Sequence, residues 1–213
     1  MAITREPVEA ALAIDARVAP ALPTIAIHPW PAPDGLPQPV DGIVVLAVQT
    51  AAEATRDQIR LQVRTAVCEV LAALLSVPLA DISLPRADGA APRIVLRDGR
   101  THAARYSISH ETGLSLAAIN LHGSIGVDLM RVHDITDWEI VARDYLGGAV
   151  ATQLAATATA LRARAFAQAW TAREASLKCA GLGLHEWQGP LNGTCRVVAL
   201  ELGADLVGTL ASA

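Results

Sequence analysis

The chain has 213 residues, of which 52% are hydrophobic and 18% are charged, and its formal net charge is −4. This composition is typical of a globular protein with a packed core and excludes a disordered chain. No uncharged apolar run reaches the roughly 18 residues that a membrane-spanning helix needs, and an acidic chain does not attract nucleic acid. We therefore expect neither a membrane segment nor a nucleic-acid partner.

The N-terminal region is rich in proline and in charge. Eight of the twelve prolines lie within residues 7–39, which predicts a non-regular arm packed on the surface. Charged side chains interrupt the first twenty residues, so we expect no signal peptide and a cytoplasmic location. The chain has three cysteines without C-x-x-C spacing, which favours small buried thiols over a disulfide framework or a metal site.

A buried strand is predicted at residues 43–48, followed by a long helix. Thr50 and Glu53 have the spacing of a capping box that opens this helix, and Pro78 marks its end. The apolar positions recur at helical spacing: Ile59, Val63, Val67, Leu71 and Leu74. Another face carries a stripe of three arginines: Arg56, Arg60 and Arg64.

Four further strands are predicted in one sheet: residues 93–97, 105–109, 114–120 and 124–130. A helical region follows at residues 136–145, with a break at Gly147-Gly148. A long alanine-rich helix then runs to about residue 180.

Two last strands, at residues 195–200 and 205–210, should pair beside the strand that contains Asp128. The order of elements suggests an α/β (α+β) fold of two similar halves, residues 1–121 and 122–213.

The helix of residues 166–180 places a carboxylate and an ammonium group, Glu174 and Lys178, one turn apart. They lie at the edge of an apolar stripe that includes Phe166 and Trp170, which predicts a half-buried pair. The alternative interpretation is an ordinary surface ion pair at i,i+4 spacing.

Two upstream motifs accompany this helix. Ser107-Ile-Ser109-His110 precedes one strand, and Gly126-Val-Asp128-Leu lies on the next. Together with Trp170-Thr-x-Arg-Glu-x-x-x-Lys178 and the following Gly-x-Gly-Leu, these motifs resemble the signature set of the 4′-phosphopantetheinyl transferase superfamily. The resemblance covers roughly residues 93–184. It implies a pseudo-twofold pair of α/β halves with coenzyme A bound between them.

The resemblance implies transfer of phosphopantetheine from coenzyme A to a serine of an apo carrier protein, with Mg²⁺ as cofactor. It assigns Asp128 and Glu174 to the metal, and Glu174 also to proton acceptance. Lys178 and His110 match residues that contact the phosphates, and Ser109 adds a hydroxyl donor. An isolated carboxylate in an apolar strand needs a cation, which supports the role of Asp128. The alternative interpretation for Asp128 and for His110 is a structural role.

Two arginines are weaker candidates for contacts with coenzyme A. Arg100 lies where relatives have a Gly-Lys-Pro turn, but Thr101 replaces the proline. Arg64 belongs to the stripe on the first long helix, where a solvated face is an equal alternative.

The sequence departs from the motif at Met130, where many relatives carry a second acid. The short acyl-carrier-protein synthases also lack that acid, so two carboxylates and an added water can suffice. The alternative is a catalytically silent protein that binds coenzyme A or carrier protein. The carrier protein, whether of fatty-acid, polyketide or nonribosomal peptide synthesis, is not marked by any motif.

Overall fold

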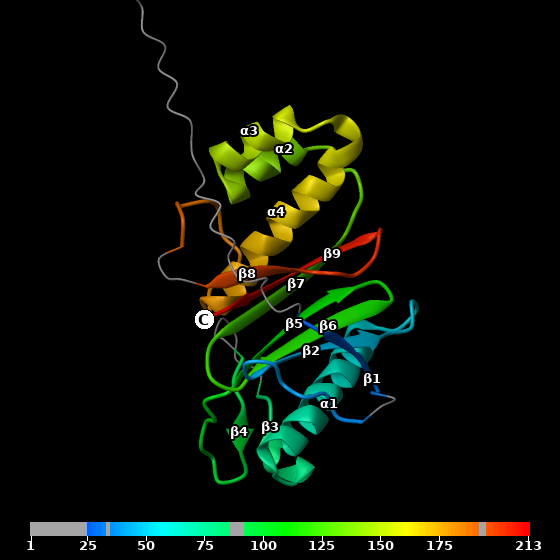
Figure 1. Ribbon diagram of the computed structural model, residues 1–213, viewed down its shortest axis with the longest axis vertical. Helices are drawn as coiled ribbons and strands as arrows, with labels where there is room; N and C mark the ends of the chain where they lie inside the picture. Colours follow the sequence, from blue (N-terminus) through cyan, green and yellow to red (C-terminus); the bar gives the residue numbers. More distant parts are fainter. Residues whose placement is uncertain (1–24, 33–34, 86–91, 192–194) are drawn as a thin grey trace, which may run out of the picture.

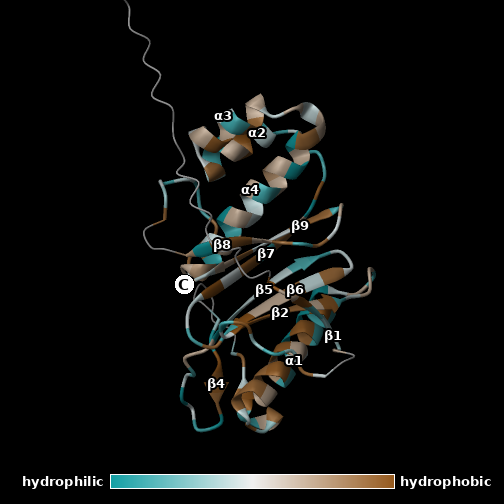
Figure 2. Ribbon diagram, in the orientation of Figure 1, coloured by the Kyte–Doolittle hydropathy of each residue, from teal (hydrophilic) through white to brown (hydrophobic). Residues whose placement is uncertain are grey.

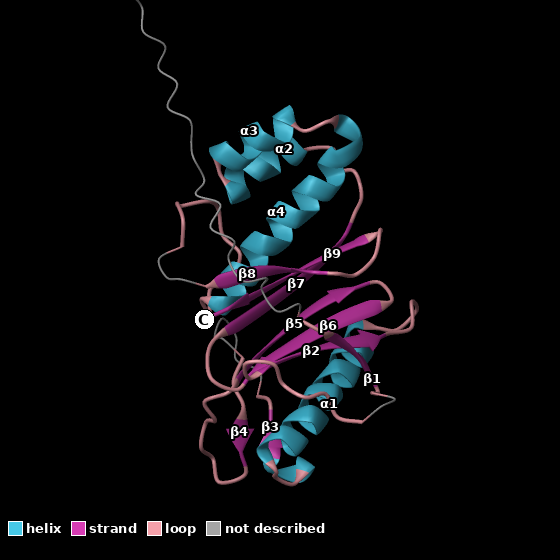
Figure 3. Cartoon of the chain, viewed as in Figure 1, coloured by secondary structure: helices cyan, strands magenta, loops and turns pink. Residues whose placement is uncertain are grey.

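The computed structural model describes residues 25–32, 35–85, 92–191 and 195–213. Within these ranges it contains four α-helices and three β-sheets, so the predicted α+β class is confirmed. The two long helices, α1 (Arg56–Leu75) and α4 (Thr159–Cys179), lie on opposite sides of the strands (Figure 1). Figure 3 shows the strands gathered between these two helices.

The larger sheet has the strand order β1-β2-β6-β5. Its members are β1 (Ile27–Trp30), β2 (Ile43–Gln49), β6 (Leu114–Asn120) and β5 (Arg105–Glu111). β6 runs antiparallel to both β2 and β5 and is almost wholly buried. α1 packs on this sheet, and Val63, Val67 and Leu71 are fully buried in the shared core. Figure 2 shows hydrophobic residues along β2, β6 and much of α1.

The second sheet has the order β7-β9-β8 and consists of β7 (Ile125–Arg131), β9 (Leu206–Ser212) and β8 (Arg196–Leu200). β9 pairs with β7 as predicted, with Asp128 opposite Thr209. α4 packs on this sheet at close range, because a Cβ atom at Gly126 would lie 1.9 Å from the carbonyl oxygen of Ala175. Thr171 and Thr209 join helix to sheet through a 2.8 Å hydroxyl–hydroxyl bond.

The prediction of one sheet for residues 93–130 was wrong. β4 (Val95–Leu96) forms a separate two-stranded sheet with the short β3 (Ile82–Ser83), which follows a 3-10 turn at Leu79–Asp81. β7 lies beside β5 without a backbone ladder. Alternate β7 amides instead donate to β5 side chains: Val127 to Ser107 Oγ at 3.0 Å, Leu129 to Ser109 Oγ at 3.2 Å and Arg131 to Glu111 Oε1 at 3.0 Å.

We call this row of side chain-to-backbone hydrogen bonds the β5–β7 seam. It brings the two sheets into contact and carries the Ser-x-Ser-His motif to the strand of Asp128. Each of the two larger sheets is covered by one long helix, which agrees with a pair of similar halves. The boundary near residue 121 stays a prediction.

The beginning of α1 differs from the prediction. Its N-cap is Thr55, whose Oγ1 accepts the Gln58 amide at 3.3 Å, while Gln58 Oε1 accepts the Thr55 amide at 2.8 Å. The predicted cap, Thr50, instead follows β2 directly and donates its amide to the Gly113 carbonyl. Both sites have capping-box spacing, and the turn at residues 51–54 decides between them. α1 ends at Leu75, before Pro78, as predicted.

The helical region after β7 is divided more finely than predicted. α2 (Trp138–Val141) continues into a π-helical turn at Ala142–Leu146 and stops at Gly147. The predicted long alanine-rich helix is two helices, because α3 (Gly148–Ala156) ends where Thr157 and Ala158 adopt extended backbone conformations. Arg162 donates to the carbonyls of Leu154 and Thr157 at this junction.

Part of the proline-rich region is regular, contrary to the prediction. β1 runs parallel to β2 at the edge of the sheet, with Pro29 opposite Ala47. An edge strand tolerates proline because one of its sides needs no ladder bonds. Residues 31–32 and 35–39 of the predicted arm form no helix or strand, and residues 1–24 and 33–34 lie outside the described residues. Among the described residues, no helix is both long and apolar enough to cross a bilayer.

Candidate functional site

Asp128, Glu174 and Lys178 meet between β7 and α4. The Lys178 ammonium group lies 2.7 Å from Asp128 Oδ1 and 3.8 Å from Glu174 Oε2, and it also donates to the Val127 carbonyl at 3.1 Å. Ser109 Oγ donates to the same Asp128 oxygen at 2.9 Å. Four predicted site residues from three separate motifs therefore form one cluster.

The cluster is substantially buried, with Asp128 only 6% exposed. Burial raises the pKa of Glu174, the negative charge of Asp128 raises it further, and Lys178 partly offsets both effects. Two carboxylates thus face one ammonium group with limited access to water. Such an arrangement suits a carboxylate that accepts a proton near neutral pH, because a raised pKa makes it a stronger base.

His110 lies at the end of β5 and contacts Ser115, its register partner on β6, with a 2.7 Å Nδ1–Oγ distance. Partial burial lowers the pKa of His110, and the positive charges of Arg60, Lys178 and Arg56 lower it further. The imidazole is therefore neutral at pH 7, and it lies within the field of three cations. These positive charges favour the binding of phosphate groups near His110.

Arg64 and Arg100, the two weaker candidates, have local partners. The Arg64 guanidinium donates to the Leu84 carbonyl, beside the N-terminal core. Arg100 is held in its turn by Asp98, with a 2.6 Å contact from Nε to Oδ2, and its side chain is 79% exposed. Contacts of either arginine with coenzyme A stay predictions.

The predicted site residues omitted three contributors. Arg56 and Arg60, although noted in the stripe, are the α1 arginines whose charge acts on His110, whereas Arg64 points to Leu84. Ser115 is fully buried against His110. The hairpin turn at Thr112-Gly113 pairs residue 110 with residue 115, so this partner could have been derived from the register.

The two carboxylates suit Mg²⁺, since this ion is usually bound through one or two carboxylates, with waters and phosphate oxygens as its other ligands. Asp128 and Glu174 face the same point, which the Lys178 ammonium group approaches. No group of three or more His, Cys, Asp or Glu side chains that could hold a metal occurs in the described parts of the chain. A bound Mg²⁺ would therefore take two carboxylates from this chain and fill its other positions from water or phosphate.

Met130 has a packing role. It contacts an apolar cluster that includes Leu146, Phe166 and Trp170, at the base of the helices above the second sheet. Phe166 and Trp170 stack at 5.9 Å with nearly parallel rings, as the predicted stripe requires. An acid at position 130 would place a charge against this cluster.

The three cysteines are free thiols. Cys179, at the end of α4, and Cys195 have sulfur atoms 2.7 Å apart. Burial, chiefly, raises the pKa of the Cys179 thiol to about 11, so this sulfur is uncharged at neutral pH. It is a packed thiol rather than a reactive thiolate.

A comparison with protein families finds a similarity within the second half of the molecule. Residues 124–207 match the family model of the 4′-phosphopantetheinyl transferase superfamily. The matched segment runs from β7 through α4 to the start of β9 and contains Asp128, Glu174 and Lys178. A comparison with curated proteins found no match.

Proposed function

We propose that this protein transfers 4′-phosphopantetheine from coenzyme A to a serine hydroxyl of an apo carrier protein and releases 3′,5′-ADP. The observation that supports this most is the meeting of Asp128, Glu174 and Lys178 at one point within the segment that matches the superfamily. The reaction needs a proton acceptor for the serine and positive charge for the pyrophosphate, and the cluster offers both.

Glu174 is the proton acceptor in this proposal. Its pKa is raised by burial and by Asp128, so it holds a proton more readily than an exposed glutamate does. It also lies 3.8 Å from Lys178, whose charge keeps the carboxylate ionised before the serine arrives. The incoming hydroxyl would lose its proton to Glu174, directly or through one water, as its oxygen attacks the β-phosphorus atom.

Phosphate binding falls to the positive groups around β5. Lys178 would neutralise the developing charge on the leaving phosphate. His110 is uncharged at pH 7, so it would donate a ring N–H to a phosphate oxygen rather than act as a cation. Arg56 and Arg60 add positive charge on the same side, with Ser109, Arg64 and Arg100 as further predicted contacts.

Mg²⁺ would be held by Asp128 and Glu174, and when bound it would supply Lewis-acid neutralisation of the pyrophosphate. Lys178 Nζ must then shift from Asp128 Oδ1, where it makes its shortest contact. The Lys178 ammonium group would then contact the phosphate in place of Asp128. The cytoplasm, where coenzyme A and carrier proteins meet, is the proposed location.

The test incubates the protein with coenzyme A, Mg²⁺ and a panel of apo carrier proteins from fatty-acid, polyketide and nonribosomal peptide synthesis. Mass spectrometry should detect phosphopantetheine on the serine of at least one carrier, with 3′,5′-ADP released in equal amount. Glu174→Gln is the matched control, since it keeps the shape but not the charge. Absence of attachment on every carrier would overturn the proposal.

Met130 supports one second candidate, a silent protein that binds coenzyme A or carrier protein without transfer. The test compares the parent with Met130→Glu in a Mg²⁺ titration of transfer. We expect the parent to be active and the variant to need less Mg²⁺, at some cost in stability because Met130 packs in an apolar cluster. Transfer by Met130→Glu alone would favour the silent protein.

A further inference from the structure

Ser115 places a fully buried hydroxyl group within the larger sheet. It is the second residue of β6, with Val48 of β2 opposite it on one side and His110 of β5 opposite it on the other. Its side chain shares a sheet face with Val48 and Ala117, which belong to the apolar core beneath α1. A hydroxyl group in such surroundings needs a hydrogen-bond partner, because an unpaired buried polar group is costly.

The partner of this hydroxyl is the His110 ring. Ser115 Oγ lies 2.7 Å from His110 Nδ1, and this is the one side-chain hydrogen bond of Ser115 in the described parts of the chain. A serine hydroxyl has one proton to donate and lone pairs with which to accept. Val48, on the other flank, offers no side-chain acceptor. The hydroxyl proton of Ser115 therefore has the Nδ1 atom as its acceptor.

The positions of the protons in this pair follow from satisfying every buried donor. If Nδ1 carried the ring proton, it would donate to Ser115 Oγ, and the hydroxyl proton would be buried without an acceptor. If Nδ1 is unprotonated, the hydroxyl donates to it and no donor of the pair is wasted. In a neutral imidazole the ring proton then lies on Nε2.

The Nε2 atom of His110 is free to serve a ligand. It has no hydrogen-bond partner among the described residues, and His110 retains exposed surface, whereas Nδ1 faces the buried Ser115. The charges of Arg60, Lys178 and Arg56 act on the ring. An N–H group in this positive environment can donate to an anion without first breaking a bond within the protein.

We propose that Ser115 is a positioning residue that holds His110 as its Nε2–H tautomer and presents this N–H group to a phosphate oxygen of coenzyme A. Ser115 acts through His110 and does not contact the cofactor. The phosphate contact rests on the proposed function, whereas the tautomer is a property of the protein alone. The pair turns an imidazole that could donate from either nitrogen into a donor with one fixed direction.

The backbone fixes the pair as firmly as the hydrogen bond does. The antiparallel register of β5 and β6 sets residues 110 and 115 directly opposite each other. The hairpin between them turns at Gly113, whose φ of +84° suits glycine. The short serine side chain then has little freedom to leave Nδ1.

NMR spectroscopy of the protein without coenzyme A provides the test. Long-range ¹H–¹⁵N correlation at pH 8 distinguishes protonated from unprotonated ring nitrogens, and the His110 signals are those that His110→Asn removes. We expect the parent to have its His110 proton on Nε2. Ser115→Ala should give a mixture of tautomers, which moves the two nitrogen resonances toward each other. Ser115→Thr keeps the hydroxyl and should keep the parent pattern.

Ser107→Ala is the matched control. It removes an equally well buried hydroxyl from the face of β5 that points to β7, where its oxygen accepts the Val127 amide. The tautomer of His110 should be unchanged in this variant. A change as large as that in Ser115→Ala would mean that the spectrum reports general disturbance of the sheet, and would overturn the assignment.

A double-mutant cycle then tests the link to the cofactor. Isothermal titration calorimetry should show coenzyme A binding about three- to tenfold more weakly to Ser115→Ala than to the parent, the size of one net hydrogen bond. The same substitution should have no effect in a His110→Ala background, because Ser115 acts only through the ring.

The outcomes separate this proposal from the proposed function. A proton on Nδ1 in the parent, or a parent-like spectrum in Ser115→Ala, would overturn the role of Ser115. Equal losses of affinity from Ser115→Ala with and without His110 would overturn it as well. A parent that has the expected tautomer but does not bind coenzyme A would instead contradict the proposed function and leave the tautomer assignment standing.

Discussion

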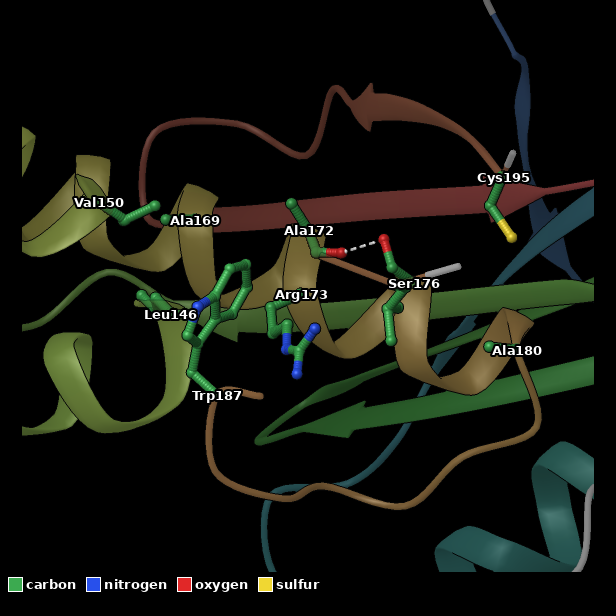
Figure 4. Close-up of a pocket in the computed structure, with 10 residues that line it drawn as sticks. Leu146, Val150, Ala169, Ala172, Arg173, Ser176, Ala180, Trp187 and Cys195 are labelled. Carbon is green, nitrogen blue, oxygen red and sulfur yellow. Dashed lines mark hydrogen bonds between the residues drawn. The ribbon is translucent and has the colours of Figure 1, made fainter. Parts of the chain in front are cut away.

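The two faces of α4 each carry one buried or half-buried cation, and the two cations differ in their partners. On the face toward β7, Lys178 has two carboxylate partners and a backbone carbonyl. On the other face, Arg173 stacks on Trp187 beside a pocket (Figure 4) and keeps two guanidinium nitrogens unpaired among the described residues. Both side chains belong to one short motif, and only the structure distinguishes their surroundings.

The difference shows which of the two cations is paired within the described parts of the chain. The Asp128 cluster satisfies its charges internally, so a ligand there must rearrange existing bonds. Arg173, in contrast, has no hydrogen-bond partner for two of its guanidinium nitrogens among the described residues. Two carboxylates share one ammonium group on the face toward β7, whereas one guanidinium on the other face has no carboxylate partner among the described residues.

We call the face of α4 toward β7 the inner face. Glu174→Gln is expected to give the largest effect, since it removes the proton acceptor from this face. Transfer to a carrier protein should fall by about 10²–10⁴-fold, the usual contribution of a general base. The measurement is the initial rate of phosphopantetheine attachment under saturating coenzyme A. Near-parent rates in a folded Glu174→Gln protein would remove Glu174 from the chemistry.

Matched methionine substitutions on α4 test the comparison of the two faces directly. Lys178→Met leaves buried Asp128 without its cation, and we expect the free energy of unfolding to fall by about 3 kcal/mol. Arg173→Met removes an unpaired charge, and we expect a gain of about 1 kcal/mol. Urea denaturation at pH 7 measures both.

The sign of the difference decides this prediction. Equal losses in the two variants would mean that the charge of Arg173 is as well compensated as the charge of Lys178. Arg173→Lys serves as the control for side-chain length with the charge retained.

A smaller effect is expected from the hydrogen bonds that bring β5 to the inner face. Ser109→Ala leaves both the Leu129 amide and Asp128 Oδ1 without the hydroxyl, and should cost about 1–3 kcal/mol. Ser107→Ala removes only the acceptor for the Val127 amide and should cost less. Thermal unfolding of both variants measures the two losses, and their difference reports the contact between Ser109 and Asp128. A larger loss from Ser107→Ala would contradict this prediction.

The inner face could be predicted from the sequence because its parts have strong local signals. Helical spacing puts Glu174 and Lys178 on one edge of α4, and an isolated Asp128 in an apolar strand demands a cation. The β5–β7 seam could not be predicted, since its donors are backbone amides and its acceptors are side chains. Period-two patterns show which residues share a strand face, not whether neighbouring strands pair through their backbones.

The opposite face of α4, which carries Arg173 and which we call the outer face, could not be predicted for a different reason. Arg173 appears in the motif as one more cation, and small residues at helical spacing do not indicate a cavity. Its burial depends on Trp187, which lies fourteen residues further along the chain and reaches Arg173 because its backbone is bonded to Asp144. The same limit applied to the cap of α1, where Thr50 and Thr55 have equal spacing signals and the turn between them decides.

The smallest expected effect concerns His110, which lies near the positive charges around the inner face but forms no ion pair with the residues there. Its pKa is lowered by partial burial and by Arg60, Lys178 and Arg56, so the folded protein disfavours the charged imidazole. The unfolded chain, with a histidine pKa of about 6.5, takes up the proton first as pH falls. Stability from this group is thus fully present above pH 6.5 or so and declines as pH falls through the folded-state pKa. Unfolding measured from pH 8 to pH 5 should show this decline in the parent and a shallower one in His110→Asn, which retains a polar group opposite Ser115.

Coenzyme A should oppose the decline in the parent, because its phosphates favour the charged imidazole, and should not do so in His110→Asn. Identical pH profiles for the two proteins would show that His110 titrates as an isolated surface residue.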